Sequence, residues 1–102
     1  MTEKKTSFQD LIQSTTPVLV DFYADWCGPC HAMNPVLKEL AGEMQEQAKI
    51  VKIDVDKNPG VANYFGVQSI PTYIVFKEGE VKWRGAGVMP KHQLKQVLTQ
   101  NV

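Results

Sequence analysis

The sequence lacks a long apolar run. Its most apolar stretch, Pro17–Val20, is interrupted by Asp21, whereas a helix that spans a bilayer needs roughly 20 apolar residues. Eleven Lys and Arg residues are balanced by eleven Asp and Glu residues, so no overall field attracts nucleic acid or an anionic membrane. Neither nucleic acid nor a membrane is therefore expected as a partner.

Repeats and linkers are absent as well. The 102 residues contain no internal repeat, no low-complexity tract and no segment rich in Pro, Gly and Ser. A single domain over residues 1–102 is expected, and its 43% hydrophobic content is sufficient for a compact core. No apolar signal-peptide core follows Met1–Thr6, which makes the cytoplasm the expected location.

The chain has only two cysteines, and they lie close together in the sequence. Cys27 and Cys30 are three positions apart. A disulfide that closes so short a loop would stabilise the fold little, and two cysteines cannot form the framework of a small secreted protein. The pair is therefore expected to perform redox chemistry or to bind a metal.

The apolar pattern alternates between strand and helix along the chain. Val18–Ala24 is β-branched or aromatic nearly throughout, which is typical of a strand buried on both faces. Apolar residues recur at helical spacing from Met33 to Ala48, with Pro35 inside this longest helix. Strands that both precede and follow helices imply a mixed sheet.

Other elements are expected along the rest of the chain. They are a short helix capped by Ser7 and ended before Pro17, a buried strand at Ile50–Val55, a short helix from Asn58 to Gly66, a hairpin of Thr72–Phe76 and Val81–Arg84 around Glu78-Gly79, and a final helix with Pro90 at its first position. Thr2–Thr6 is too polar to predict a strand.

The segment Ala24–Cys30, with the sequence Ala-Asp-Trp-Cys-Gly-Pro-Cys, joins a predicted strand to a predicted helix. In this context Cys-x-x-Cys is typical of a redox site. Here the chain resembles the thioredoxin family, and the similarity runs from about Ser7 to the C-terminus. The further residues that carry it are Asp21, Lys52, Ile70-Pro71-Thr72, Gly79 and Gly87. The resemblance implies an α/β thioredoxin fold, with a central mixed β-sheet flanked by helices on both faces.

The two cysteines suit thiol–disulfide exchange, which needs one activated thiol and a second thiol within reach. Cys27 is expected just before the first helical turn, where the helix dipole lowers the pKa of its thiol, an effect already known from thioredoxins. It is the predicted nucleophile. Cys30, one turn further on, is expected to be more buried and to act as the resolving thiol. Gly28 and Pro29 complete the active-site loop, and Pro29 stiffens it.

Two charged residues are candidate catalytic groups beside the cysteines. Asp21 interrupts an apolar strand, so its carboxylate is expected to be desolvated and its pKa raised. The alternative is a carboxylate that faces water at the end of the strand. The resemblance implies that Asp21 helps to remove the proton from Cys30, and that Lys52 lies near this carboxylate and tunes it.

The resemblance also implies a surface that binds an extended substrate peptide by strand addition. Ile70-Pro71 is expected to contain a cis peptide bond next to the disulfide. Trp26 is expected on one rim of this surface, with Gly60, Gly87 and Val88 on its other sides. The alternatives are an ordinary trans proline, a core tryptophan and glycines chosen for their φ angles.

The function implied by the resemblance is that of a protein-disulfide reductase in electron transport and cell redox homeostasis. Its redox-active disulfide needs no bound cofactor, and its electrons come from NADPH through a thioredoxin reductase. The other expected partners are disulfide-containing client proteins, and the chain is expected to be a monomer. An oxidase or an isomerase would share the fold, but Gly-Pro between the cysteines resembles the reducing members.

Three other interpretations remain open. Cys27–His31 also fits Cys-x-x-Cys-His, the attachment motif of c-type haem. A zinc site would have to use Cys27, Cys30, His31 and His92. The fold could also serve as a non-catalytic binding module. Tyr23 and His31 depart from the family, which often has Trp and Lys or Arg at these positions, and His31 could make the redox potential sensitive to pH.

Overall fold

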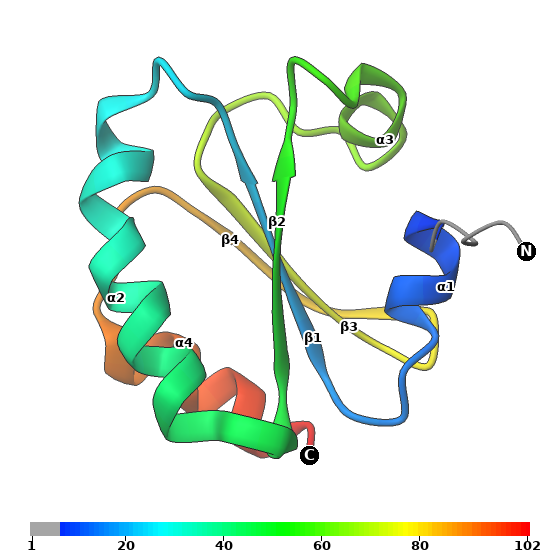
Figure 1. Cartoon of the computed structure of the whole chain (residues 1–102). Coiled ribbons are helices and arrows are strands. Elements are labelled where there is room, and N and C mark those ends of the chain that lie inside the picture. The colour runs from blue at the N-terminus through cyan, green and yellow to red at the C-terminus, as the bar shows by residue number, and fades with distance from the viewer. Residues whose placement is uncertain (1–6) are drawn as a thin grey trace, which may run out of the picture.

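A computed structural model describes residues 7–102 of the chain (Figure 1). The elements of this part are, in chain order, α1 (Phe8–Ile12), β1 (Val18–Tyr23), α2 (Gly28–Met44), the 3-10 helix η1 (Gln45–Gln47), β2 (Lys49–Asp54), α3 (Pro59–Tyr64), β3 (Thr72–Lys77), β4 (Glu80–Ala86) and α4 (Lys91–Gln100). Thr2–Thr6, for which no strand is predicted, lies outside the described residues.

The strands of the described part form one mixed sheet in the order β2-β1-β3-β4. β1 runs parallel to β2 and antiparallel to β3, and β3 runs antiparallel to β4. The side chains of Val18, Leu19, Val20 and Phe22 are fully buried. The prediction of a mixed sheet built around a strand with two buried faces is therefore confirmed.

Helices cover both faces of the sheet, as predicted (Figure 1). Successive side chains of a strand point to opposite faces, so β1 contributes to two separate cores. Leu19 packs with the buried side of α2 and α4, whereas Val18, Val20 and Phe22 pack with Ile12 of α1 on the other face. The arrangement of helices on both faces of the sheet thus follows from the apolar side chains that β1 directs to each face.

Some element boundaries differ from the predictions. The predicted strand Ile50–Val55 is observed as Lys49–Asp54 and is only half-buried, because β2 is an outer strand of the described sheet. Pro90 is the N-cap of α4 and not its first helical residue, since its backbone is extended with φ −72° and ψ 150°. Ser7 is confirmed as the cap of α1, because its hydroxyl accepts the backbone N–H of Asp10 at 3.1 Å.

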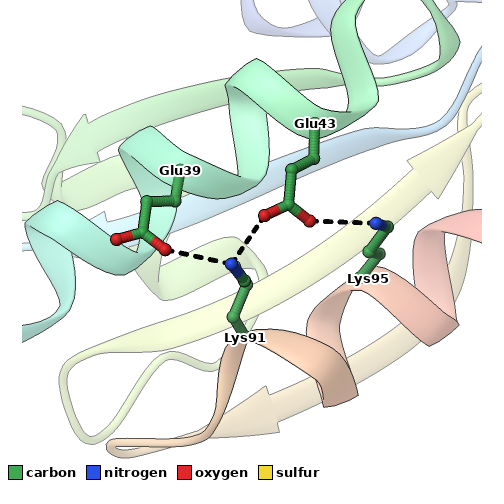
Figure 2. A network of polar contacts seen from close by, with 4 residues as sticks. All are labelled: Glu39, Glu43, Lys91 and Lys95. Atoms are coloured by element: carbon green, nitrogen blue, oxygen red, sulfur yellow. Dashed lines mark hydrogen bonds and ion pairs between the residues drawn. The ribbon is translucent and has the colours of Figure 1, made fainter.

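An ion-pair network joins α2 to α4 (Figure 2). Lys91 Nζ lies 3.0 Å from Glu39 Oε1 and 2.6 Å from Glu43 Oε2, and Lys95 Nζ lies 2.9 Å from Glu43 Oε1. A single exposed ion pair contributes little to stability, but here two carboxylates of α2 share two ammonium groups of α4. The network helps to hold α4 against the helix that begins at the cysteine pair.

Candidate active site

Cys27 and Cys30 form a disulfide where β1 passes into α2, with their Cα atoms 5.3 Å apart. Cys27 is the N-cap of α2, and its Sγ accepts the backbone N–H of Cys30 at 3.1 Å. Pro29 fits within the first turn, where its missing N–H leaves no helical hydrogen bond unmade. The predicted position of Cys27 just before the first helical turn is confirmed.

The two cysteines are equally buried, because each is 3% exposed. The prediction that Cys30 would be the more buried one is therefore wrong for the disulfide form. The hydrogen bond from Cys30 turns the Cys27 sulfur back over the first turn, and Tyr23, Val55 and Ile70 pack against the pair. What distinguishes Cys27 is its place at the cap of the helix, where unpaired N–H groups favour a thiolate.

Asp21 lies in the middle of β1, and its side chain is only 1% exposed. Its register partners are Lys52 on β2 and Tyr73 on β3. Burial raises the pKa of Asp21 from 3.8 to about 6, and Lys52 offsets part of this rise. The predicted desolvation and raised pKa are confirmed, whereas the alternative of a carboxylate facing water is wrong.

Lys52 is exposed, and other groups hold its ammonium. Its Nζ donates a hydrogen bond to Asn34 Oδ1 at 2.7 Å and lies 4.4 Å from the centroid of the Tyr23 ring. Within the described residues Lys52 forms no ion pair with Asp21. Sequence reasoning did not identify Asn34. A polar residue four positions after Cys30 was its only signal.

Trp26 is 72% exposed, so the alternative of a core tryptophan is wrong. Its indole Nε1 donates a hydrogen bond to Asp56 Oδ2 at 2.9 Å, which joins the active-site loop to the segment that follows β2. Sequence reasoning did not identify Asp56. The residues that line a shallow groove beside the disulfide are Trp26, Val55, Val67, Gln68, Ser69 and Ile70.

The Ile70–Pro71 peptide bond is cis, as predicted, and the trans alternative is wrong. Ile70 packs against the disulfide, and within residues 7–102 its backbone N–H and carbonyl make no hydrogen bond. Gly87 donates its backbone N–H to the Pro71 carbonyl at 2.9 Å and has a φ of 87°. Val88, the next residue, is 65% exposed. Ile70 thus lies against the cysteines, and the hydrogen bond from Gly87 to Pro71 joins the segment that contains Val88 to the residue after Ile70.

Gly60 lies elsewhere. It is the second residue of α3 and lines a different hollow, together with Phe8 and Ile12 of α1 and with Tyr64. It is not among the residues of the groove beside Trp26. The expected position of Gly60 on a side of the substrate surface is therefore not reflected in the residues that line this groove.

The residues of the alternative zinc site are not gathered in the described part, and the two cysteines of the alternative haem motif are paired with each other. Among residues 7–102, no three His, Cys, Asp or Glu side chains lie close enough together to hold a metal ion. His31 is exposed and its Nε2 lies 2.5 Å from the Asp25 carbonyl oxygen, whereas His92 belongs to α4. The disulfide also uses both sulfur atoms that haem attachment would need.

No helix in the described part is long and apolar enough to cross a membrane.

Comparisons with known proteins identify close relatives over nearly the whole chain. The family model Thioredoxin matches residues 1–100. The chain is 50% identical over 97 residues to the thioredoxin of Staphylococcus saprophyticus, covering 95% of the chain and 92% of that protein. It is 43% identical over 94 residues to thioredoxin 1 of Synechococcus elongatus, covering 92% and 88% respectively. The solved structure of a mutant thioredoxin from Halobacterium salinarum is similar with a TM-score of 0.85 and 37% identity, over 97% of this chain and 86% of the other.

Proposed function

The chain belongs to the thioredoxin family of thiol–disulfide oxidoreductases, and from this premise we propose that it is a reductase of protein disulfides. One observation supports the proposal most directly. The Sγ of Cys27 caps α2 and accepts the backbone N–H of Cys30. The N-terminus of this helix thus stabilises the Cys27 sulfur and also places the Cys30 sulfur next to it.

In the first step the Cys27 thiolate attacks one sulfur of a client disulfide. The client S–S bond breaks, a mixed disulfide with Cys27 forms, and the other client sulfur leaves as a thiolate that takes a proton from water. The position of Cys27 at the helix N-terminus supports its role as the nucleophile, because the same N–H groups and dipole that bind an anion stabilise a thiolate.

In the second step Cys30 resolves the mixed disulfide. The Cys30 thiol gives its proton to the Asp21 carboxylate, and its thiolate attacks the Cys27 sulfur. The Cys27–Cys30 disulfide forms, and the second client sulfur leaves with the electron pair of the broken bond. A buried carboxylate with a pKa of about 6 is ionised at neutral pH and still basic enough to accept this proton. Lys52 tunes its basicity.

Client binding is assigned to the surface beside the disulfide. The free backbone N–H and carbonyl of Ile70, next to Pro71, offer hydrogen bonds to an extended peptide. Trp26 forms one rim of this surface, and Gly87 and Val88 lie on another side. The groove at Trp26 and Ile70 accepts an apolar side chain of the client. Gly60 has no part in this surface.

The oxidised chain must receive two electrons before the next turnover. The proposed donor is NADPH, acting through a thioredoxin reductase, because the Cys27–Cys30 couple itself carries the electrons and needs no bound cofactor. We assign the chain to the cytoplasm as a monomer, since a reductase works where thiols are kept reduced. Sedimentation of the purified protein and localisation of a tagged chain test these two assignments.

Trapping of the mixed disulfide tests the roles of the two cysteines. A Cys30→Ser variant should accumulate a covalent complex with a disulfide-containing protein, since its first step proceeds and its second does not. Cys27→Ser, the matched control, should form no such complex. A complex formed by Cys27→Ser and not by Cys30→Ser would reverse the assignment. The complex is detected by non-reducing electrophoresis and disappears when a dithiol is added.

A further inference from the structure

Asn34 links the helix of the cysteine pair to the surroundings of Asp21. It lies on α2 four residues after Cys30, so the two side chains are neighbours on one side of that helix. Its Oδ1 accepts a hydrogen bond from Lys52 Nζ at 2.7 Å. Lys52 in turn is the register partner of Asp21 on the neighbouring strand.

The register would allow a different position for this ammonium. Register partners on adjacent strands have side chains that start close together, so Lys52 is well placed for an ion pair with Asp21. Instead its Nζ is bound to Asn34 and stacked over the Tyr23 ring, and both carboxylate oxygens of Asp21 lack a hydrogen-bond partner in the described part. Asn34 and Tyr23 therefore compete with Asp21 for the Lys52 ammonium.

We propose that Asn34 is a positioning residue, which keeps the Lys52 ammonium off the Asp21 carboxylate and so keeps this carboxylate able to take the proton of Cys30. The second half of this inference rests on the role of Asp21 in the proposed function. Asn34 contacts neither the client nor the disulfide in this account. It acts only through the position of Lys52.

Few other groups act on Asp21. Lys52 is its register partner on β2, and Tyr73 is its register partner on β3. Asp21 is directed to the same face of the sheet as Leu19, which packs against α2, the helix of Cys30. Tyr73 stays neutral at working pH, because burial and the charge of Asp21 both raise the pKa of its hydroxyl. In the disulfide form the cysteine sulfurs carry no charge. Burial is the main cause of the raised pKa of Asp21. Among the described residues the Lys52 ammonium is the charge that lowers this pKa, so its closer approach would lower it further.

The direct test is an NMR titration of the Asp21 carboxyl carbon in the oxidised, full-length protein. Asn34→Ala, at a helix position that accepts alanine, should lower the titration midpoint of Asp21 by about one pH unit, as an opposite charge at close range does. Lys52→Met should raise the midpoint. The double variant Asn34→Ala with Lys52→Met should titrate like Lys52→Met alone, because Asn34 then has no ammonium to hold.

Two further variants make the test specific. Asn34→Asp keeps an oxygen that binds Lys52, so its Asp21 midpoint should not fall below that of the wild type. Asn63→Ala, at an exposed position of α3, is the matched control and should leave the midpoint unchanged. The inference is overturned if Asn34→Ala leaves the Asp21 midpoint in place, or lowers it equally when Lys52 is Met.

A kinetic measurement separates this inference from the proposed function. The rate at which Cys30 releases a client from the mixed disulfide should show a pH inflection that moves with the Asp21 midpoint in Asn34→Ala. An inflection that stays in place while the NMR midpoint moves would overturn the role of Asp21 as proton acceptor but uphold the positioning by Asn34. A fixed midpoint would overturn the positioning alone.

Discussion

Asp21 and Tyr73 lie opposite each other on β1 and β3, and both are buried. Within the described residues neither the two carboxylate oxygens of Asp21 nor the hydroxyl of Tyr73 has a hydrogen-bond partner. A buried polar group without a partner costs stability, and proteins keep such groups mainly where they serve function. Asp21 has such a function in the proposed mechanism, whereas the Tyr73 hydroxyl has none there.

Tyr73→Phe should therefore stabilise the oxidised protein. Removing an unpartnered buried hydroxyl relieves a desolvation cost of roughly 1–3 kcal/mol, and we expect a gain of about 1 kcal/mol. Urea unfolding at neutral pH measures it. Tyr23→Phe is the control. Tyr23 is half-buried, and phenylalanine keeps the ring that lies under Lys52, so this variant should change stability by less than about 0.5 kcal/mol. A Tyr73→Phe protein less stable than the wild type would show that the hydroxyl is satisfied in solution.

Asp21→Asn should remove a pH dependence of stability. The folded pKa of Asp21 is raised from 3.8 to about 6, so the folded protein holds this proton more tightly than the unfolded chain. Its contribution to stability is present below pH 3.8 and is lost as the pH rises to about 6. The loss amounts to about 3 kcal/mol, at about 1.4 kcal/mol per pH unit.

The difference in unfolding free energy between wild type and Asp21→Asn isolates this group. Between pH 4 and pH 7 the wild type should lose about 2 kcal/mol relative to the variant, because part of the loss already lies below pH 4. Asp25→Asn, at an exposed carboxylate of the neighbouring loop, is the control. A difference that does not change with pH would mean that Asp21 is not desolvated in solution.

Gly87→Ala and Gly42→Ala should have opposite effects. A Cβ at either position meets no atom within 4 Å, so backbone conformation decides the outcome. Gly87 has a φ of 87°, and a non-glycine residue there costs about 1–2 kcal/mol. Gly42 lies in α2, where alanine gains up to about 1 kcal/mol over glycine. Thermal unfolding of the two variants should show a lower melting temperature for Gly87→Ala and a higher one for Gly42→Ala. A Gly87→Ala protein as stable as the wild type would contradict the positive φ of Gly87.

Glu43→Gln should weaken the contact between α2 and α4 in a salt-dependent way. Glu43 binds both Lys91 and Lys95, and these bonds lower the pKa of its carboxyl. The stabilisation is thus present above the ordinary value of 4.5 and is lost as the pH falls through the lowered folded pKa. The variant should melt slightly below the wild type at low salt and neutral pH, and the difference should vanish in 1 M salt. Glu46→Gln, an exposed residue of η1, is the control.

Local patterns were sufficient to predict the elements of the fold. The segment Val18–Ala24, apolar except for Asp21, predicts a central strand, and the Ser7 cap and the spacing from Met33 onwards predict two helices. The burial of β2 could not be predicted in the same way. Its apolar residues Ile50, Val51 and Ile53 predict a buried strand, but its place at the outside of the described sheet leaves it half-buried.

The site residues that belong to a sequence motif could be predicted. The residues that join the site only through tertiary contacts could not. The Cys27–Cys30 spacing and the cis bond before Pro71 follow from the family resemblance. Asn34 and Asp56 matter through hydrogen bonds to Lys52 and Trp26, partners that are 18 and 30 positions away in the sequence. No local pattern reports such contacts. The equal burial of the two cysteines likewise depends on how other segments pack over them.

The equilibrium reduction potential of the Cys27–Cys30 couple tests the central claim most directly. The purified protein is equilibrated in defined dithiol/disulfide buffers, and its oxidised fraction is measured after quenching with acid. A reductase predicts a potential clearly below the cytosolic glutathione poise, which biochemical extraction places at about −220 to −260 mV. A potential at or above about −180 mV would contradict the account and indicate an oxidase or isomerase on the same fold.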